Sequence, residues 1–235
     1  MTLADRFQGV VFGPQKAMAA LAEKPLWIDA LIVVLIFIIL GAVLAAPYSA
    51  QDSLKAMKDN VKLQDRLGKD RYETTIRNME TAEPTAVKVR AAIFATVPFL
   101  IGLFISAAVI LIMGRLVSTQ GAYIPILAVL AQANFIDKIF GGLVRTALVL
   151  ARKSVFQTST SLVLFAPKVE FMSTPYILLS QVDFFQIWMF SVVGYGLAAV
   201  FKIPIRKAMI LSFAFWLVKS MLYVALAFAT RSYFG

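Results

Sequence analysis

The stretch DFFQIWMFSVVGYGLAAVFKIPIRKAMILSFAFWLVKSMLYVALAFA, residues 183–229, decides the fold. It contains two long apolar segments joined by the short basic turn FKIPIRK, residues 201–207. Each segment is long enough to cross a bilayer, which takes about 20 residues at a rise of 1.5 Å per residue. Because a proline loses nothing at the start of a helix, Pro204 marks where the second segment begins. The stretch therefore predicts a helical hairpin in a membrane.

The composition places the whole chain in a membrane. Sixty per cent of its 235 residues are hydrophobic and its mean hydropathy is +0.80, whereas soluble domains are apolar over about half of their residues. We therefore predict one all-α, polytopic membrane domain over residues 1–235. The sequence has no Cys and no His, which excludes disulfides and thiolate or imidazole chemistry. We expect neither a metal nor a cofactor.

The net charge of +10 indicates lipid partners rather than nucleic acid. The excess Lys and Arg residues lie around the apolar segments, where anionic lipid headgroups attract them. The sequence also lacks a phosphate-binding glycine loop, a Gly-x-Ser-x-Gly turn and any metal-ligand spacing. We therefore expect a protein that is not an enzyme and whose partners are membrane lipids and other membrane proteins.

Apolar segments predict five membrane spans, preceded by an amphipathic segment. Residues 1–25 place apolar side chains among Arg and Lys, with a second helical start at Gly13-Pro14, which predicts a segment lying in the membrane interface. Trp27 is expected to anchor the first span at that interface. The expected spans cover residues 26–47, 91–113, 123–150, 184–202 and 205–230.

Two segments are expected outside the bilayer. Residues 151–182 contain Pro167 and Pro175 and predict a loop with partly buried apolar patches. Residues 49–90 carry nine Lys or Arg and seven Asp or Glu, and their periodicity predicts a helix or helical pair with a narrow apolar stripe. This stripe either packs on the protein's own helix ends or forms a docking surface for a partner. Its residues are Leu54, Met57, Val61, Leu67, Tyr72, Ile76 and Met79.

Polar residues interrupt the third span. Asn134, Asp137, Lys138 and Arg145 lie within it, together with the paired glycines at 141 and 142. Charged groups inside a membrane face other protein or water rather than lipid. We therefore expect a helix to about residue 137, a bend, and a second helix that emerges toward residue 152.

Lys219 lies near the middle of the fifth span, where an unpaired ammonium costs about 2.5–3.5 kcal/mol. At 1.5 Å per residue, Lys219 and Asp137 fall at similar depths, so we predict an intramembrane pair between them. The alternative is that Lys219 extends along its aliphatic stem to the interface. At the start of the fourth span, Asp183 is expected to cap the helix, with Trp188 one turn further on as a packing or anchoring residue.

Five spans put the two termini on opposite sides of the membrane. The Lys and Arg residues of the 201–207 turn favour the cytoplasmic side for that end. We therefore predict an inner (plasma) membrane protein with a cytoplasmic N-terminus and with its C-terminus outside. The charged segment 49–90 would then also lie outside, which is acceptable because long loops translocate largely regardless of their charge.

Short motifs follow one another along the chain in a characteristic order. They are Phe12-Gly13-Pro14, Lys24-Pro25-Leu26-Trp27, Asp183 to Trp188, Gly194 to Leu197, Arg206-Lys207-Ala208 and Trp216. This order resembles the Yip (Ypt-interacting protein) domain family. That family typically has an acidic residue with F-x-x-W entering the fourth span, a G-L late in it, a K-K-A opening the fifth span and a Trp inside it. The resemblance covers nearly all of the chain apart from residues 49–90.

The resemblance implies a five-span, all-helical membrane protein with a cytoplasmic N-terminus. Eukaryotic members of the family work with Rab-type GTPases in vesicle traffic, whereas bacterial members often look like companions of ABC-type export systems. The insertion at 49–90 makes this chain more similar to a bacterial-type member, which implies an accessory role beside ABC-type transporter subunits. The alternatives are a small transporter or channel that uses the polar break and Lys219, and a trafficking factor like the eukaryotic members. A homo-oligomer is compatible with each.

Overall fold

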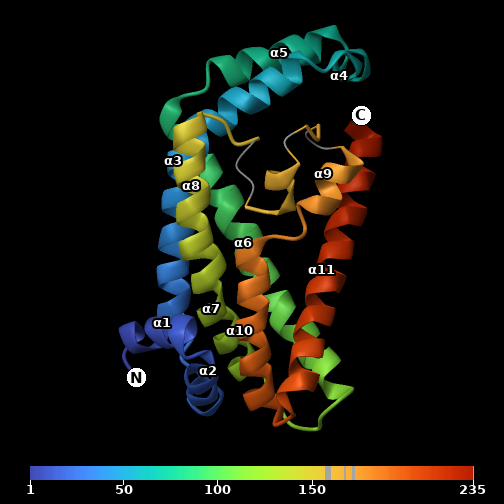
Figure 1. Ribbon diagram of the computed structural model, residues 1–235. Coiled ribbons are helices and arrows are strands. Elements are labelled where there is room, and N and C mark those ends of the chain that lie inside the picture. The colour runs from blue at the N-terminus through green and yellow to red at the C-terminus, as the bar shows by residue number, and fades with distance from the viewer. Residues whose placement is uncertain (157–159, 167, 171–172, 235) are drawn as a thin grey trace.

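Five long helices form a bundle whose two termini lie at opposite ends (Figure 1). The computed structural model describes residues 1–156, 160–166, 168–170 and 173–234, and the side chains of all of these except 61–62 and 230–234. Over these ranges every regular element is a helix. Five of the helical segments are long and apolar enough to cross a membrane. This confirms the all-α, polytopic membrane fold that the sequence predicts.

The first two spans are longer than the sequence predicts. α3 runs over Ile28–Lys58 and α6 over Pro84–Arg115. Pro47, which was expected to end the first span, lies inside α3, as Pro98 lies inside α6. An internal proline removes one backbone hydrogen bond and allows a bend without ending the helix. Pro84 occupies the first position of α6, where its missing N–H costs nothing.

The third span is built from three helical pieces. These are α7 (Tyr123–Asn134), the π-helix η1 (Phe135–Gly141) and α8 (Gly142–Arg152). In its most apolar window 78% of the residues are buried, compared with 17% for α3 and 22% for α6. The interrupted span is therefore the core of the bundle and not a lipid-facing rod.

The last two spans form the hairpin that the sequence predicts. α10 covers Phe184–Phe201 and α11 covers Ile205–Phe234. α10 ends at Lys202, which has a left-handed backbone conformation with φ of 51°. The hydroxyl of Ser118, in the turn after α6, donates a 2.7 Å hydrogen bond to the carbonyl oxygen of Phe201. The two short turns at this end of the bundle are thus joined.

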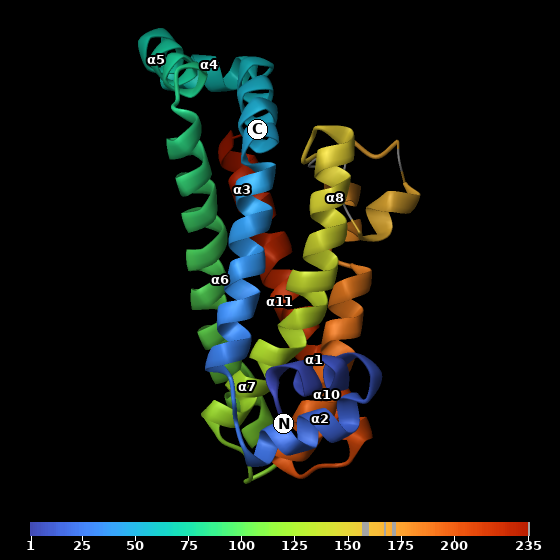
Figure 2. The same cartoon turned by 90° about the vertical axis from the view of Figure 1, so that its left-hand side faces the viewer.

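Two short helices precede the first span and lie across the N-terminal end of the bundle (Figures 1 and 2). They are α1 (Leu3–Phe12) and α2 (Pro14–Glu23). Val10, Met18 and Leu21 on their apolar faces are at most 1% exposed. α2 packs against α10 and α7. The amphipathic segment therefore covers its apolar face with the protein's own helices and not with lipid alone.

A partly buried ion pair fixes these short helices to the first span. Arg6 is 3% exposed and pairs with Asp29 in the first turn of α3, and it also donates a 3.2 Å hydrogen bond to the carbonyl oxygen of Leu26. At the start of α1, Thr2 and Asp5 form a reciprocal capping box. The hydrogen bonds from Thr2 hold the pKa of the Asp5 carboxyl below its ordinary value.

The charged segment between the first two spans folds at the opposite end of the bundle (Figure 1). It contains α4 (Val61–Leu67) and α5 (Lys69–Glu80), and α5 packs on the end of α3. The hydroxyl of Tyr72 donates a 3.3 Å hydrogen bond to the carbonyl oxygen of Met57. The side chains of Lys58 and Glu80 form a 2.6 Å ion pair.

The apolar stripe of this segment is partly covered by the protein itself. Five of its members are half-buried, namely Leu54, Met57, Tyr72, Ile76 and Met79. Leu67 is 37% exposed, and the side chain of Val61 lies outside the described residues. Packing of α5 on α3 accounts for much of this cover, because a narrow stripe on a short helix is satisfied by one neighbouring helix.

The second expected loop contains two short helical turns. η2 covers Leu162–Phe165 and α9 covers Thr174–Leu179. Residues 157–159, 167, 171 and 172 of this loop lie outside the described residues. α9 contacts α11, and Ile177 is 2% exposed. The loop therefore rests on the fifth span at the end of the bundle that carries α5.

Candidate functional site

The π-helix in the third span concentrates charge inside the membrane. Each turn of a π-helix contains more residues than an α-helical turn, so side chains around it take positions that a regular helix would not offer. Asp137 and Lys138 lie within this turn, and Lys138 is near the middle of the 30-residue span. Asn134 donates a 2.8 Å side-chain hydrogen bond to the carbonyl oxygen of Leu130 just before it.

The Asp137 carboxylate is buried between two cations. It is 4% exposed. The ammonium of Lys138 lies 2.7 Å from its Oδ2, and Nη2 of Arg145 lies 2.8 Å from its Oδ1. The same Nη2 donates a 2.6 Å hydrogen bond to the backbone carbonyl oxygen of Asp137. A buried carboxylate needs such partners, because an unpaired charge in a low-dielectric interior is strongly unfavourable.

Arg145 also connects the third span to the fourth. Its Nη1 lies 3.5 Å from Oδ2 of Asp183 and 3.2 Å from the hydroxyl of Thr160. The other carboxylate oxygen of Asp183 accepts hydrogen bonds from the backbone N–H groups of Phe185, at 2.9 Å, and Gln186, at 3.2 Å. Asp183 is therefore both the N-cap of α10 and an ion-pair partner of the third span.

Lys219 contacts side chains of α10. Its ammonium donates a 3.3 Å hydrogen bond to Oε1 of Gln186 and lies 5.4 Å from the ring centroid of Phe190. A pair between Asp137 and Lys219 is not among the ion pairs that the described residues form within 4.0 Å. The physical reason is that Lys138 already occupies one side of the carboxylate and Arg145 the other.

The whole cluster carries more positive than negative charge. Three cations, Lys138, Arg145 and Lys219, gather around the two carboxylates of Asp137 and Asp183. Part of the positive charge is accessible at the protein surface, because the side chains of Lys138 and Arg145 are 33% and 30% exposed. The carboxylate of Asp137, in contrast, is buried. The cluster therefore presents cations at its surface.

These two cations line a cleft on the side of the bundle where α3 and α6 stand next to α8 (Figure 2). The cleft has a volume of about 340 Å³. Its wall on α3 combines the small residues Gly41, Ala42 and Ala45 with Phe37 and Ile38. Small residues allow a neighbouring transmembrane helix to approach closely. The cleft thus joins a cationic surface to a wall that suits helix packing.

The two tryptophans singled out in the sequence both lie in aromatic contacts. Trp188 stacks on Phe140 of the π-helix at 6.1 Å between ring centroids with an interplanar angle of 20°. Trp27 meets Phe104 of α6 edge to face at 6.1 Å. Both side chains are half-buried. Each therefore packs against another span of the bundle.

Sequence reasoning missed two connections. The first is Arg145 with Asp137 and Asp183, although the spacing of eight residues from 137 to 145, about two helical turns, was a usable signal. The second is Arg6 with Asp29, for which an isolated acid in the first turn of a span was the signal. Within the described ranges no group of three acidic side chains gathers in a way that would hold a metal ion.

Comparison with known proteins identifies one family. The model of the Yip1 domain matches residues 9–227, which is nearly the whole chain. The matched range includes the 49–90 segment. It covers all five spans except the last turns of α11. No curated protein and no solved structure matches the chain.

Proposed function

Since the chain belongs to the Yip1 domain family, we propose that it is a non-enzymatic accessory protein of the membrane. It binds a larger membrane complex and stabilises or regulates it. The protein is multi-pass, and its broad apolar surface meets lipids and other membrane proteins.

The cationic cleft between α3, α6 and α8 carries the proposal. Lys138 and Arg145 are partly exposed there at membrane depth, where an uncovered charge is unfavourable by about 2.5–3.5 kcal/mol. A transmembrane helix of a partner that carries a carboxylate would neutralise this charge and pack against Gly41, Ala42 and Ala45. The same carboxylate would find no competing acid on the cleft wall, because Asp137 is covered and already paired.

The partner class that we propose is an ABC-type exporter, which is the role that the resemblance of the sequence motifs to a bacterial-type member would imply. The half-buried stripe on α3 and α5, together with exposed Leu67, offers a second contact outside the bilayer. Burial of the apolar area of this stripe that α3 and α5 leave uncovered would stabilise that contact. These two surfaces have no residue in common, so they can be tested separately.

We propose an inner-membrane location with the N-terminus in the cytoplasm and the C-terminus outside. Support comes from the termini at opposite ends of the bundle and from the basic turn 201–207, which lies at the N-terminal end (Figure 1). Because the sequence contains no Cys, single cysteines introduced at each terminus report the orientation without background. Labelling of the C-terminal cysteine from outside is expected, and labelling of the N-terminal one would overturn this topology.

The accessory role is tested by purifying tagged protein from its native membrane in mild detergent, followed by mass spectrometry. ATPase and permease subunits are expected at stoichiometric amounts with the unmodified chain. Ala42→Phe fills the cleft and should abolish this recovery. Leu40→Phe is the matched control, because Leu40 is 53% exposed on the same helix and does not line the cleft. Recovery of the chain alone, or equal recovery with Ala42→Phe, would contradict the proposal.

A small transporter is the competing function, favoured by the excess of cations in the cluster and by Lys219 on the fifth span. The paired and buried state of Asp137 argues for a structural role instead. Flux measurements on reconstituted Lys219→Leu separate the two functions. A transporter should lose flux in this variant, whereas an accessory protein should keep its partner.

A further inference from the structure

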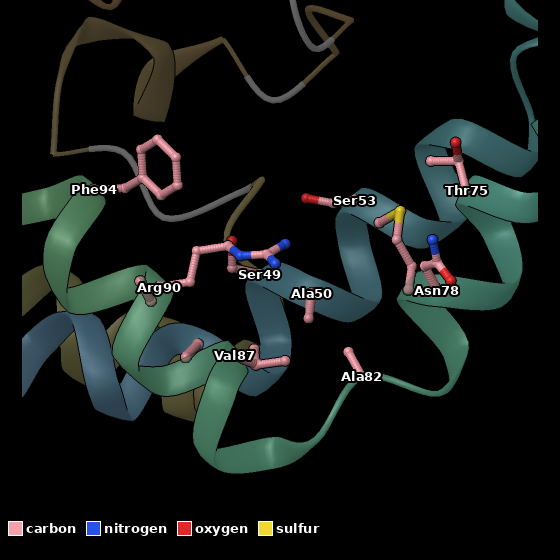
Figure 3. A pocket seen from close by; sticks show the side chains of 12 residues that line it. Ser49, Ala50, Ser53, Thr75, Asn78, Ala82, Val87, Arg90 and Phe94 are labelled. Carbon is pink, nitrogen blue, oxygen red and sulfur yellow. The ribbon is translucent and has the colours of Figure 1, made fainter. Parts of the chain in front are cut away.

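A second cavity lies at the end of the bundle that carries α5. It is a groove of about 550 Å³ between the end of α3, the end of α5 and the start of α6 (Figure 3). Its walls combine apolar residues such as Ala46, Ala91 and Phe94 with polar ones from all three helices. The groove therefore suits an amphiphilic molecule better than a purely apolar or purely ionic one.

Arg90 is the charged residue that lines this groove. Figure 3 shows its guanidinium group extending from α6 toward α3, where Ser49 and Ser53 lie. None of the lining residues is acidic. Glu80, at the nearby end of α5, is engaged by the ammonium of Lys58 at 2.6 Å. The groove is thus positively charged and complementary to an anion.

Four of its five polar side chains have no partners within the part of the protein that the structure describes. Arg90, Ser49, Ser53 and Asn78 form no side-chain hydrogen bond or ion pair there, whereas the hydroxyl of Thr75 donates to a backbone oxygen of its own helix. Four donors from three helices therefore converge on one groove and remain available. Such convergence is what recognition of a phosphate requires.

The position of the groove along the spans identifies the source of the phosphate. Arg90 is the last charged residue before the apolar run 91–113, and Ser49 follows the apolar run 26–47. The groove thus lies at the boundary between hydrocarbon and water. Phe94 on its membrane side is 71% exposed and Ile93 beside it is 54% exposed, so an acyl chain that continues from the groove meets apolar side chains.

We propose that this groove binds the headgroup of an anionic phospholipid. The phosphate pairs with Arg90 and accepts hydrogen bonds from Ser49, Ser53 and Asn78, and an acyl chain runs over Phe94 along α6. Bound lipid would join α5 to the first two spans. This inference uses residues outside the cationic cleft, and Met79 is the member of the apolar stripe that also lines the groove.

The test is a lipid titration of the purified full chain in detergent, with bound lipid counted by native mass spectrometry. The probes are phosphatidylglycerol, phosphatidylcholine and diacylglycerol with identical acyl chains. Phosphatidylglycerol is expected to bind most tightly and diacylglycerol most weakly. Arg90→Gln should weaken phosphatidylglycerol binding about tenfold, the loss expected for a charge-assisted hydrogen bond. Ala50→Leu fills the groove without changing charge and should weaken it similarly.

Lys88→Gln is the matched control, because Lys88 is exposed two residues away on α6 and does not line the groove. Its affinity for phosphatidylglycerol should stay within about twofold of the unmodified chain, since a distant exposed charge contributes little. Equal losses in Arg90→Gln and Lys88→Gln, or equal binding of diacylglycerol and phosphatidylglycerol, would overturn the proposal. Displacement of the lipid by millimolar inorganic phosphate would show a site for a free anion, and would overturn it as well.

Discussion

Neutralising Asp137 and Arg145, singly and together, tests whether the charged cluster holds the bundle together. The variants are Asp137→Asn, Arg145→Gln and the double variant, which define a thermodynamic cycle. At the 2.8 Å separation of the charged atoms, the gross attraction is about 6 kcal/mol at an effective dielectric constant of about 20. Desolvation of both groups offsets much of this attraction. We therefore expect a coupling free energy of about 2–3 kcal/mol.

The exposed pair Lys58 and Glu80 provides the matched control. Its atoms are 2.6 Å apart, closer than those of the buried pair, but its side chains are 49% and 46% exposed. Solvent screening reduces the coupling of such a pair to about 0.2–1 kcal/mol. The corresponding cycle uses Lys58→Gln and Glu80→Gln. Like the cycle on Asp137 and Arg145, it removes one positive and one negative charge, but from a pair that is exposed to solvent.

The assay is equilibrium unfolding in mixed detergent micelles, followed by tryptophan fluorescence. Trp188 contacts the π-helix through Phe140, so its emission reports on packing next to the cluster. Asp137→Asn alone should be the most damaging single variant, because it leaves the ammonium of Lys138 without its carboxylate and leaves Arg145 with the longer, 3.5 Å contact to Asp183. A coupling free energy for the buried pair no larger than that of the exposed pair would refute the reasoning.

Four further substitutions test the packing of the spans in the same unfolding assay. Lys219→Leu should leave the free energy of unfolding unchanged or raise it, because a charge inside the membrane is removed; a loss above about 1 kcal/mol would show an essential contact. Asp183→Ala should lower it by about 2 kcal/mol through loss of both hydrogen bonds that cap α10, and an unchanged value would rule out that role. Gly196→Ala places a Cβ 2.3 Å from the side chain of Val129 and should lower it by about 1–3 kcal/mol. Gly102→Ala meets no atom within 4 Å and should be neutral or stabilising by up to about 1 kcal/mol, so a similar loss in both would contradict the packing argument.

The sequence predicted the five spans because apolar segments of this length are compatible with few structures other than a membrane-spanning helix. It was less informative on boundaries. Pro47 was expected to end the first span, but a proline inside a long helix removes only one hydrogen bond, and α3 continues to Lys58. Glu83-Pro84 was a usable start signal for α6, because proline is favoured at the first helical position.

The polar site was predicted in composition but not in its pairing. The sequence identified Asp137, Lys138, Arg145 and Lys219 as charges at membrane depth. Depth along a helix does not fix the direction in which a side chain points, and the π-helix changes that direction for every residue after Asn134. Regular helical spacing pointed to Arg145, about two turns from Asp137, but could not show that Lys138 would also reach the carboxylate.

Site-specific photo-crosslinking from the cationic cleft tests the central proposal most directly. A photoreactive residue is placed at Ala42, inside the cleft, or at Leu40, outside it on the same helix, and activated in native membranes. The accessory role predicts one protein adduct from position 42 that maps to a transmembrane segment bearing an Asp or Glu, with no such adduct from position 40. Adducts with lipid alone at position 42, or the same proteins at both positions, would contradict it.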